Sequence, residues 1–346
     1  MIKRVLLLTV GLLFFTAAVF ADSLRIHFID VGQGDAILLE APDATVLVDA
    51  GQYDDAVDYL RAADIERIDL AIATHAHADH VGGFPPIFKS IEVAEVWYNG
   101  QEHTTLTFER FLDAVLDSGA AYHEPIRGER VEYGDLAIEV LHPTESAADY
   151  DGDLHDMNII VRVSYGEFAV MLTGDAESDV ERELVETGNL TLTSTVLKLG
   201  HHGSNTSSTR EFLEAVAPAI AVYQAGEDNR YGHPHDEVLW RLDEYTAAEV
   251  YGNDVHGTIV IETDGVDYSV RVESDGSLDT PAAACIDLNT ANADQLTELI
   301  HIGEGRAEAI IDMRPIESKS ELIRIHGIGD ARLEDIRDQG VVCPIE

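Results

Sequence analysis

The chain has 346 residues, of which 45% are hydrophobic and 25% charged, and this composition excludes a disordered chain and a membrane bundle. Acidic residues number 65 against 22 basic ones, which gives a formal net charge of −43. Such a surface repels polyanions at low salt, so one interpretation is a substrate other than nucleic acid. The other is a halophilic host, because molar salt screens charge within about 3 Å. The acidic excess runs along the whole chain, which favours the halophilic interpretation.

The first 21 residues have the three parts of a secretory signal peptide. Lys3 and Arg4 precede an apolar stretch over residues 5–20, and small residues surround a cleavage site after Ala21. The apolar stretch is shorter than the roughly 20 residues of a transmembrane helix. We therefore expect residues 1–21 to be removed, with no stable membrane insertion afterwards. The mature protein would be secreted or periplasmic, in an oxidising space where two cysteines can pair.

Short apolar stretches broken by turns follow the signal. They predict an antiparallel opening sheet with strands at residues 25–29, 36–40 and 45–49. A helix over residues 56–63 leads into a buried strand at 69–74. Further strands are predicted at 93–98, 136–141, 159–163 and 168–172, with helices over 108–118, 178–187 and 209–216. This order predicts a layered α/β domain over residues 22–273, with two sheets face to face and helices outside.

A polar stretch at residues 274–284 lacks periodicity and is interpreted as a linker. The remaining segment, 285–346, is helical and contains an internal repeat. Ile302-Gly303 precedes a helix over 306–313, and Gly327-Ile328-Gly329 precedes one over 331–338. Because so small a domain has a small core, we expect a disulfide between Cys285 and Cys343 to stabilise it.

Three imidazoles and a carboxylate fall within six positions directly after the strand at 69–74, in His75-Ala76-His77-Ala78-Asp79-His80. Imidazole and carboxylate together suit zinc, manganese or iron. A chance cluster is the alternative in a chain with 15 His. The fixed offsets at the end of a strand favour a metal-binding loop.

Other strands also end in potential ligands. Asp49 and Asp175 each close a strand, and His201-His202 follow a third. The order Asp, His-x-His-x-Asp-His, Asp, His resembles the metallo-β-lactamase fold superfamily over residues 24–272. Four motifs within it resemble the hydrolase domain of the ComEC competence proteins: Asp30-Val31-Gly32-Gln33-Gly34-Asp35-Ala36, Thr173-Gly174-Asp175-Ala176-Glu177, Gly200-His201-His202-Gly203-Ser204 and Tyr231-Gly232-His233-Pro234-His235.

The resemblance implies an αββα sandwich and a site for two divalent metal ions, Zn or Mn. His75 and His77 would hold the first ion, together with His155 from the motif His155-Asp156-Met157-Asn158, where Asp156 is the reserve. The second ion would be held by Asp79, His80 and His201, and Asp175 would bridge the two. Asp49 would lie beneath and orient the ligand loop.

The predicted catalytic residues are Asp79, Asp175, His202 and His233. Only one of two adjacent residues on an extended segment can face the same ion, so His202 would meet the substrate rather than the metal. His202 or His233 would stabilise or protonate the leaving oxygen, and Asp175 would accept a proton from water. A Ser-His-Asp triad is the competing mechanism, but Gly-x-Ser-x-Gly is absent from the sequence.

Several neighbouring residues keep two interpretations. Ser204 either donates to a phosphate or caps the following helix. His235 either reaches the site or belongs only to a turn. Asp30 and Asp35 either line the pocket or stabilise a glycine-rich turn.

The start of the C-terminal segment, Asp287-Leu288-Asn289-Thr290-Ala291, and the two hairpins resemble the tandem helix-hairpin-helix domain of the competence protein ComEA. This resemblance implies that Gly303, Gly327 and Gly329 present backbone N–H groups to a DNA phosphate. His301 replaces the leading glycine of the first hairpin, and acids outnumber bases locally. A small protein-interaction module is the alternative.

The sequence therefore predicts a secreted, dinuclear metal-dependent hydrolase joined to a helix-hairpin-helix module. The expected activity is that of a phosphodiesterase or nuclease on extracellular or periplasmic DNA, single- or double-stranded, with a possible part in competence. One alternative is a metallohydrolase of a small ester, lactone or phosphodiester. Another is a non-enzymatic exported DNA-capture protein, against which the complete ligand set argues.

Overall fold

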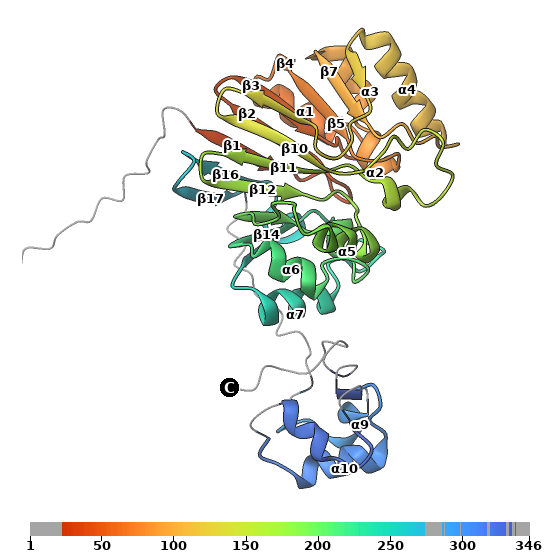
Figure 1. The fold of residues 1–346 in the computed structure, drawn as a ribbon, viewed down its shortest axis with the longest axis vertical. Helices are drawn as coiled ribbons and strands as arrows, with labels where there is room; N and C mark the ends of the chain where they lie inside the picture. Colours follow the sequence, from red (N-terminus) through yellow and green to blue (C-terminus); the bar gives the residue numbers. More distant parts are fainter. Residues whose placement is uncertain are drawn as a thin grey trace, which may run out of the picture.

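The structure is a computed structural model that describes residues 23–227, 229–273, 286, 288–297, 299–316, 319–329, 332–333 and 336. The predicted signal peptide, the predicted linker and both cysteines of the predicted disulfide lie outside these residues. Within the described residues, two large sheets account for nearly all of the strands (Figure 1).

The first sheet has eight strands and carries the opening segments of the domain. β1, β2 and β3 pair antiparallel as predicted, whereas β3, β5, β7 and β8 run parallel to one another. In spatial order the strands are β17 (Tyr268–Val272), β16 (Ile259–Thr263), β1 (Leu24–Phe28), β2 (Ile37–Ala41), β3 (Ala44–Val48), β5 (Leu70–Ala73), β7 (Glu95–Tyr98) and β8 (Ala121–His123).

The second sheet has seven strands. β9 to β12 form an antiparallel meander, after which β12, β13, β14 and β15 are parallel. In spatial order they are β15 (Glu249–Gly252), β14 (Ile220–Tyr223), β13 (Val196–Lys198), β12 (Phe168–Leu172), β11 (Ile160–Tyr165), β10 (Leu136–His142) and β9 (Arg130–Tyr133). A short parallel pair joins β4 (Arg67–Ile68) to β6 (Glu92–Val93).

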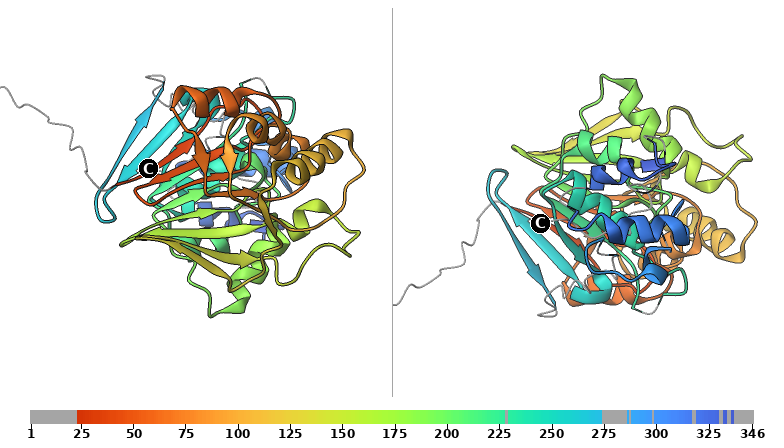
Figure 2. Two further views of the ribbon diagram at one scale, coloured as in Figure 1. Left: turned by 90° about the horizontal axis from the view of Figure 1, so that it is seen from above. Right: turned by 90° about the horizontal axis from the view of Figure 1, so that it is seen from below.

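The two sheets lie face to face with helices on their outer sides (Figure 2). The inner faces meet in one apolar core that includes Phe28 of β1, Ile72 of β5 and Val170 of β12. The outer face of the first sheet packs on α1 (Asp55–Ala62), α2 (Ala78–Val81), α3 (Phe84–Ser90) and α4 (Leu106–Ser118). The outer face of the second packs on α5 (Ser178–Thr187), α6 (Arg210–Val216) and α7 (Asp236–Tyr245). The predicted αββα sandwich is confirmed.

The parallel pairing brings the predicted ligands to common sheet edges. β3 and β5 are neighbours, so Asp49 after β3 lies beside the loop that follows β5. β12 and β13 are neighbours in the other sheet, so Asp175 and His201 follow adjacent strand ends. Carboxyl ends of parallel strands are where such folds collect functional side chains. Three short helices complete this region, η1 (Leu154–Met157), η2 (Gly200–Gly203) and α8 (Asn253–His256).

The described part of the C-terminal segment has a small apolar core of its own, formed by residues such as Leu296, Ile310 and Leu322. Its elements are α9 (Ala293–Leu296), α10 (Glu304–Asp312) and η3 (Lys319–Arg324). α10 begins within two residues of the predicted helix over 306–313. The second predicted helix falls mostly outside the described residues.

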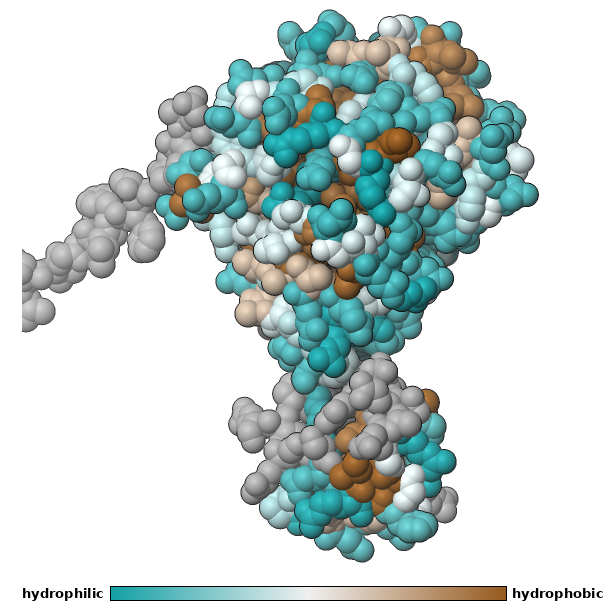
Figure 3. All heavy atoms as spheres, in the orientation of Figure 1, coloured by the Kyte–Doolittle hydropathy of each residue, from teal (hydrophilic) through white to brown (hydrophobic). Residues whose placement is uncertain are grey.

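The surface view in Figure 3 is largely hydrophilic, as the acidic composition suggests. The large apolar side chains that remain exposed include Leu106 and Leu116 of α4. Among the described residues, no helix has the length and apolarity needed to cross a membrane.

Candidate metal centre

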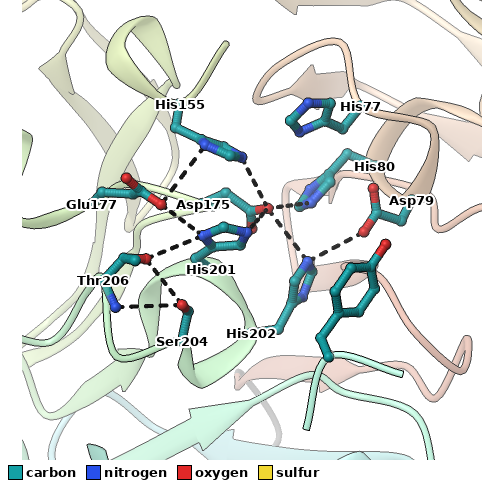
Figure 4. A network of polar contacts seen from close by, with 12 residues as sticks. His77, Asp79, His80, His155, Asp175, Glu177, His201, His202, Ser204 and Thr206 are labelled. Carbon is teal, nitrogen blue, oxygen red and sulfur yellow. Dashed lines mark hydrogen bonds and ion pairs between the residues drawn. The ribbon is translucent and has the colours of Figure 1, made fainter. Parts of the chain in front are cut away.

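Asp175 occupies the middle of a ring of imidazoles at the edge where the two sheets meet (Figure 4). It follows β12 and is buried. The Asp175 backbone N–H donates to Asn158 Oδ1 at 3.2 Å, and the Asn158 amide donates to Thr173 O at 2.6 Å. Asn158 therefore fixes the turn that presents the Asp175 carboxylate.

The first donor cluster contains His75, His77, His155 and Asp175. His75 Nε2 lies 2.9 Å from His77 Nδ1 and 3.8 Å from Asp175 Oδ2. His155 Nε2 lies 3.9 Å from the same oxygen. These are the four residues that the family resemblance assigns to the first ion. Asp156, the reserve ligand, is exposed and accepts a hydrogen bond from Tyr150 at 2.6 Å.

The second cluster contains His80, His202, Asp175 and Asp35. His80 Nε2 lies 3.2 Å from Asp175 Oδ2, and His202 Nε2 lies 3.4 Å from it. Asp79 adds a carboxylate 3.4 Å from His202 Nε2, with its side chain 26% exposed. Asp79 is thus the accessible acid of a group that is otherwise buried.

Asp35 faces the opposite nitrogens of this cluster. Its carboxylate lies 3.1 Å from His202 Nδ1 and 3.9 Å from His80 Nδ1, whereas the Nε2 atoms point to Asp175. An imidazole binds a metal through one nitrogen and is oriented through the other. His202 Nδ1 donates to Gln224 O at 2.9 Å, so this carbonyl orients the ring. We therefore interpret Asp35 as a buried charge beside His202 rather than as a ligand.

The placement of His201 and His202 differs from the predicted one. His202 lies in the second cluster, and the His201 ring lies beside His155, with centroids 4.4 Å apart. The prediction assumed an extended segment, but both residues have positive φ, 48° and 57°. In this left-handed turn both imidazoles face Asp175, with their centroids 6.0 Å apart. His202 therefore lies among the candidate metal donors of the second cluster.

Glu177 orients His201 from behind. Its Oε1 lies 3.0 Å from His201 Nδ1, which leaves Nε2 facing Asp175 at 3.9 Å. His155 has a similar arrangement, with Nδ1 3.0 Å from Asp153 Oδ1. Both imidazoles are held by a carboxylate on the side away from the centre.

Asp49 lies beneath the ligand loop, where the resemblance places it. His80 Nδ1 lies 2.7 Å from Asp49 Oδ2, and Thr74 donates to the carboxylate through its backbone N–H and its hydroxyl, each at 2.8 Å. Asp49 therefore directs His80 Nε2 toward Asp175.

Lys198 is a buried cation beneath the second cluster that the sequence analysis did not assign. Its ammonium forms an ion pair with Asp35 and donates to Gly174 O at 3.0 Å. The sequence contained a signal for this ion pair, since Lys198 continues the apolar strand that starts at Val196. A lysine is seldom fully buried without a charged partner.

The glycine-rich segment 30–36 packs directly under the ligand loop. Asp35 N–H donates to Asp79 O at 3.1 Å, and a Cβ on Gly34 would lie 2.3 Å from that oxygen. Only glycine permits this approach. Asp35 and Asp30 were predicted either to line the pocket or to stabilise the turn, and each takes one of these places. Asp35 faces the site, whereas exposed Asp30 accepts a hydrogen bond from Gly32 N–H in the turn.

Other residues that were left open take local roles. Ser204 Oγ accepts from Thr206 N–H at 3.3 Å. His235 Nδ1 accepts from Asn205 N–H at 2.9 Å. His233 lies next to the cluster, with its ring 5.7 Å from that of His201 and 6.2 Å from that of His202.

The donor set fits divalent metal ions. His80 Nε2, His155 Nε2, His202 Nε2 and Asp175 Oδ1 are buried without a well-formed hydrogen bond, and the three nitrogens face Asp175. Buried polar atoms are rarely left in this state, so several that converge on one carboxylate indicate a bound cation. Imidazole and carboxylate donors suit zinc or manganese.

The electrostatics agree with this fit. Burial lowers the pKa of His75 well below its usual range and that of His77 to about 4, so both imidazoles are neutral. Burial also disfavours charge on His80 and His202, but Asp175, with Asp49 and Asp35, outweighs it and raises the pKa of both. A bound cation would balance the negative charge of these carboxylates in place of the protons on His80 and His202. Its binding would release those protons.

The hairpins of the C-terminal segment have matching backbone conformations. Gly327 has φ +86° and His301 has φ +65°, so the histidine adopts the conformation of the glycine it replaces. Gly303 directly precedes α10 as its N-cap. The Arg306 side chain lies between the hairpins and donates to His326 O at 3.4 Å. Gly329 lies in the second hairpin, beside Gly327.

Comparison with known proteins agrees with both halves of the fold. Residues 29–227 match the metallo-beta-lactamase superfamily, and residues 282–339 match the helix-hairpin-helix motif. The ComE operon protein 3 of Bacillus subtilis (strain 168) is 30% identical over 272 residues, which cover 72% of this chain and 34% of that protein. A deoxyribonuclease of Thioalkalivibrio sp. (strain K90mix) is 37% identical over 111 residues, 32% of this chain and 27% of that one.

Among solved structures, the metallo-beta-lactamase fold protein YhfI from Bacillus subtilis superposes with a TM-score of 0.50 at 15% identity, covering 70% of this chain and 100% of that one. The predicted resemblance to a ComEC-like hydrolase domain joined to a helix-hairpin-helix domain is confirmed. The matched regions span about a third or less of the two curated relatives.

Proposed function

Because this chain belongs to the metallo-beta-lactamase superfamily, we propose that it is a dinuclear, metal-dependent phosphodiesterase that cleaves extracellular or periplasmic DNA. In this proposal residues 22–273 form the hydrolase domain and residues 285–346 deliver it to DNA. The 21 N-terminal residues direct export, and the acidic surface suits a medium of high salt.

The observation that carries the proposal is the pair of donor clusters that share Asp175. His75, His77 and His155 complete one of these clusters, and His80 and His202 belong to the other. A structural metal site is closed and needs one ion. Two adjoining sites with a partly exposed acid, Asp79, are typical of hydrolysis instead.

When bound, two divalent ions activate water and stabilise the charge of a phosphodiester undergoing displacement. The protein's own contribution is to hold the donors in place. Asp49 fixes the ring of His80, and the backbone carbonyl of Gln224 fixes that of His202. Asp79, ionised beside His202 and partly exposed, is positioned as a carboxylate ligand of the second ion at the accessible side of the cluster. Its pKa stays below the usual range, since the His202 contact and the nearby His80 outweigh the effect of burial.

His233 is proposed to act at the leaving oxygen as a neutral hydrogen-bonding group. Burial, with the neighbouring His202, lowers its pKa to about 4, so its imidazole carries no charge at neutral pH. Its Nδ1 is buried without a hydrogen-bond partner. A neutral imidazole of this kind donates through one nitrogen only.

DNA is favoured as the substrate by the second half of the chain. The helix-hairpin-helix match covers residues 282–339, and Gly303 of the first hairpin is the N-cap of α10, where backbone N–H groups are presented at a helix start. Similarity to a ComE operon protein and to a deoxyribonuclease also supports DNA as the substrate, and it suggests a part in competence.

The test is cleavage of linear double-stranded and single-stranded DNA by the full chain loaded with Zn²⁺ or Mn²⁺, at low and at high salt. Asp79→Ala and His80→Ala are expected to abolish cleavage and to leave DNA binding by the C-terminal segment intact. Cleavage that survives both substitutions, or that needs no metal, contradicts the proposal.

The net charge of −43 favours a second candidate, hydrolysis of a small ester, lactone or phosphodiester, for which an acidic surface is no obstacle. Turnover of bis-p-nitrophenyl phosphate without cleavage of either DNA form, under any salt and metal, would establish this alternative.

A further inference from the structure

The segment that leads to His233 is held rigidly by one side chain. Asn229 Oδ1 accepts from the backbone N–H groups of Tyr231 and His233, at 3.2 and 2.9 Å. Its amide donates to His233 O at 2.6 Å and to Gly226 O at 3.0 Å. Tyr231 and the preceding Arg230 therefore stand at a fixed place beside the metal centre.

A stack of rings connects this place to the cluster. The Tyr231 ring lies nearly parallel to that of His233, at 21° and 5.6 Å, and His233 stacks on His202 at 27° and 6.2 Å. His233 is 8% exposed, whereas Tyr231 is 49% exposed. The stack thus begins at the surface and ends at His202 of the second donor cluster.

Arg230 covers the outer end of this stack. Its guanidinium lies 4.8 Å from the centre of the Tyr231 ring and donates to the Tyr231 hydroxyl at 2.6 Å. Most arginines of the sandwich are paired with carboxylates, for example Arg25 with Glu40. Among the described residues no carboxylate forms an ion pair with exposed Arg230.

Within the described part of the chain the Arg230 guanidinium bonds to the Tyr231 hydroxyl and to no carboxylate, so its other N–H groups can bind an anion. The ring stack runs from Tyr231 through His233 to His202, so the positive charge of Arg230 stands at the outer end of the stack that leads to the cluster.

We propose that Tyr231 and Arg230 form a subsite for the nucleotide next to the scissile phosphodiester. The base stacks on the exposed Tyr231–Arg230 pair, and the guanidinium binds the adjoining phosphate. Aromatic and guanidinium surfaces accept any base, and this combination is how proteins hold single strands without reading sequence. The inference rests on the proposed nuclease function and names the part of the substrate that the hydrolase domain recognises.

The test compares two substrates in the full-length, metal-loaded protein. One is a single-stranded oligonucleotide, and the other is methyl p-nitrophenyl phosphate, a diester without a neighbouring nucleotide. Tyr231→Ala and Arg230→Ala are each expected to lower the ratio of kcat/KM for the oligonucleotide to kcat/KM for the small diester about tenfold. Arg230→Ala should also reduce the slope of log KM against log salt by about 0.7, the value for one phosphate contact on a single strand.

A matched control is available in the same domain. Arg210 also lies over a tyrosine ring, that of Tyr245 at 4.9 Å, but it pairs with Glu214. Arg210→Ala should leave both the substrate ratio and the salt slope unchanged.

Three outcomes contradict the subsite. DNA cleavage unchanged in both variants overturns it while leaving the nuclease function standing. Equal losses on the two substrates also overturn it, because Tyr231 would then act only by supporting His233. If the unmodified protein cleaves the small diester and not DNA, the nuclease proposal fails and the subsite fails with it.

Discussion

Replacement of Lys198 by methionine tests whether the buried polar layer beneath the second cluster stabilises the fold. Lys198 is 0% exposed and Asp35 is 1% exposed, so the ion pair between them has no contact with solvent. Methionine fills a similar volume and removes the charge and the hydrogen bond to Gly174 O. Asp35 then keeps its contact with His202 but loses its strongest compensating charge.

The expected cost is large because the remaining partner cannot reach water. Removal of one partner of a buried ion pair lowers the free energy of unfolding by about 3–5 kcal/mol. This figure includes the cost of leaving the Gly174 carbonyl without its hydrogen bond. Burial pushes the pKa of Asp35 upward, and Lys198, with His202, holds it below its usual value. Without Lys198, part of the penalty is relieved by proton uptake at Asp35. The loss should therefore shrink as the pH falls, with the unfolded carboxyl near its usual pKa of about 3.9.

The free energy of unfolding is measured by urea denaturation of the metal-free chain at pH 7, with Lys89→Met as the control. Lys89 is an exposed lysine of α3, and its replacement should change stability by less than about 0.5 kcal/mol. The double variant Lys198→Met/Asp35→Asn should recover a large part of the loss, because no unpaired carboxylate remains. A loss below about 1 kcal/mol for Lys198→Met would refute the reasoning.

Three further predictions concern other parts of the molecule. Asp49→Asn should weaken binding of a divalent ion at the second donor cluster by about 10- to 100-fold, because Asp49 orients His80. The affinity is measured by competition with a fluorescent chelator, and equal affinity in the variant would contradict this role. Burial raises the pKa of Glu181 to about 7 despite the hydrogen bonds that its carboxylate accepts from Ser208 and Thr209. The stability that protonated Glu181 contributes is therefore fully present below pH ~4.3 and is lost as the pH rises through about 7. Glu181→Gln should therefore flatten the fall in unfolding free energy between pH 5 and pH 8, and an unchanged slope speaks against the shift. His301→Gly should stabilise the C-terminal segment by about 1 kcal/mol in thermal unfolding, since His301 has φ +65°, and destabilisation would show that its side chain supports the hairpin.

Much of the fold was predictable because its signals are local. The helix predicted over residues 178–187 and the strand over 168–172 match α5 and β12 residue for residue. The ligand loop at 75–80 was predictable because its donors sit within one turn of chain after a buried strand. Hydrophobic period and strand-end position carry this information without any long-range contact.

The division of roles within the site was harder to predict, because it depends on backbone angles and on distant contacts. His202 occupies the second cluster only because residues 201 and 202 have positive φ, which sequence spacing does not reveal. Asp35 reaches His202 and Lys198 across the interface of the two sheets. A motif shows which donors are present, while the pairings between distant segments decide which nitrogen of each imidazole faces the centre.

The position of β1 has a consequence for how the chain is made. β1 pairs with β2 on one side and with β16 on the other, so residues 24–28 bond to residues 259–263. Until a ribosome has synthesised those late residues, the first strand presents an unpaired edge and the sheet beneath the ligand loop is incomplete. Contacts between residues this far apart in sequence slow folding. Until they form, the unpaired strand edge is exposed and prone to aggregation. The hydrolase fold thus closes late, after almost all of its own sequence has been synthesised. A chain truncated before residue 259 would contain every predicted metal ligand, but its first sheet would lack β16 and β17.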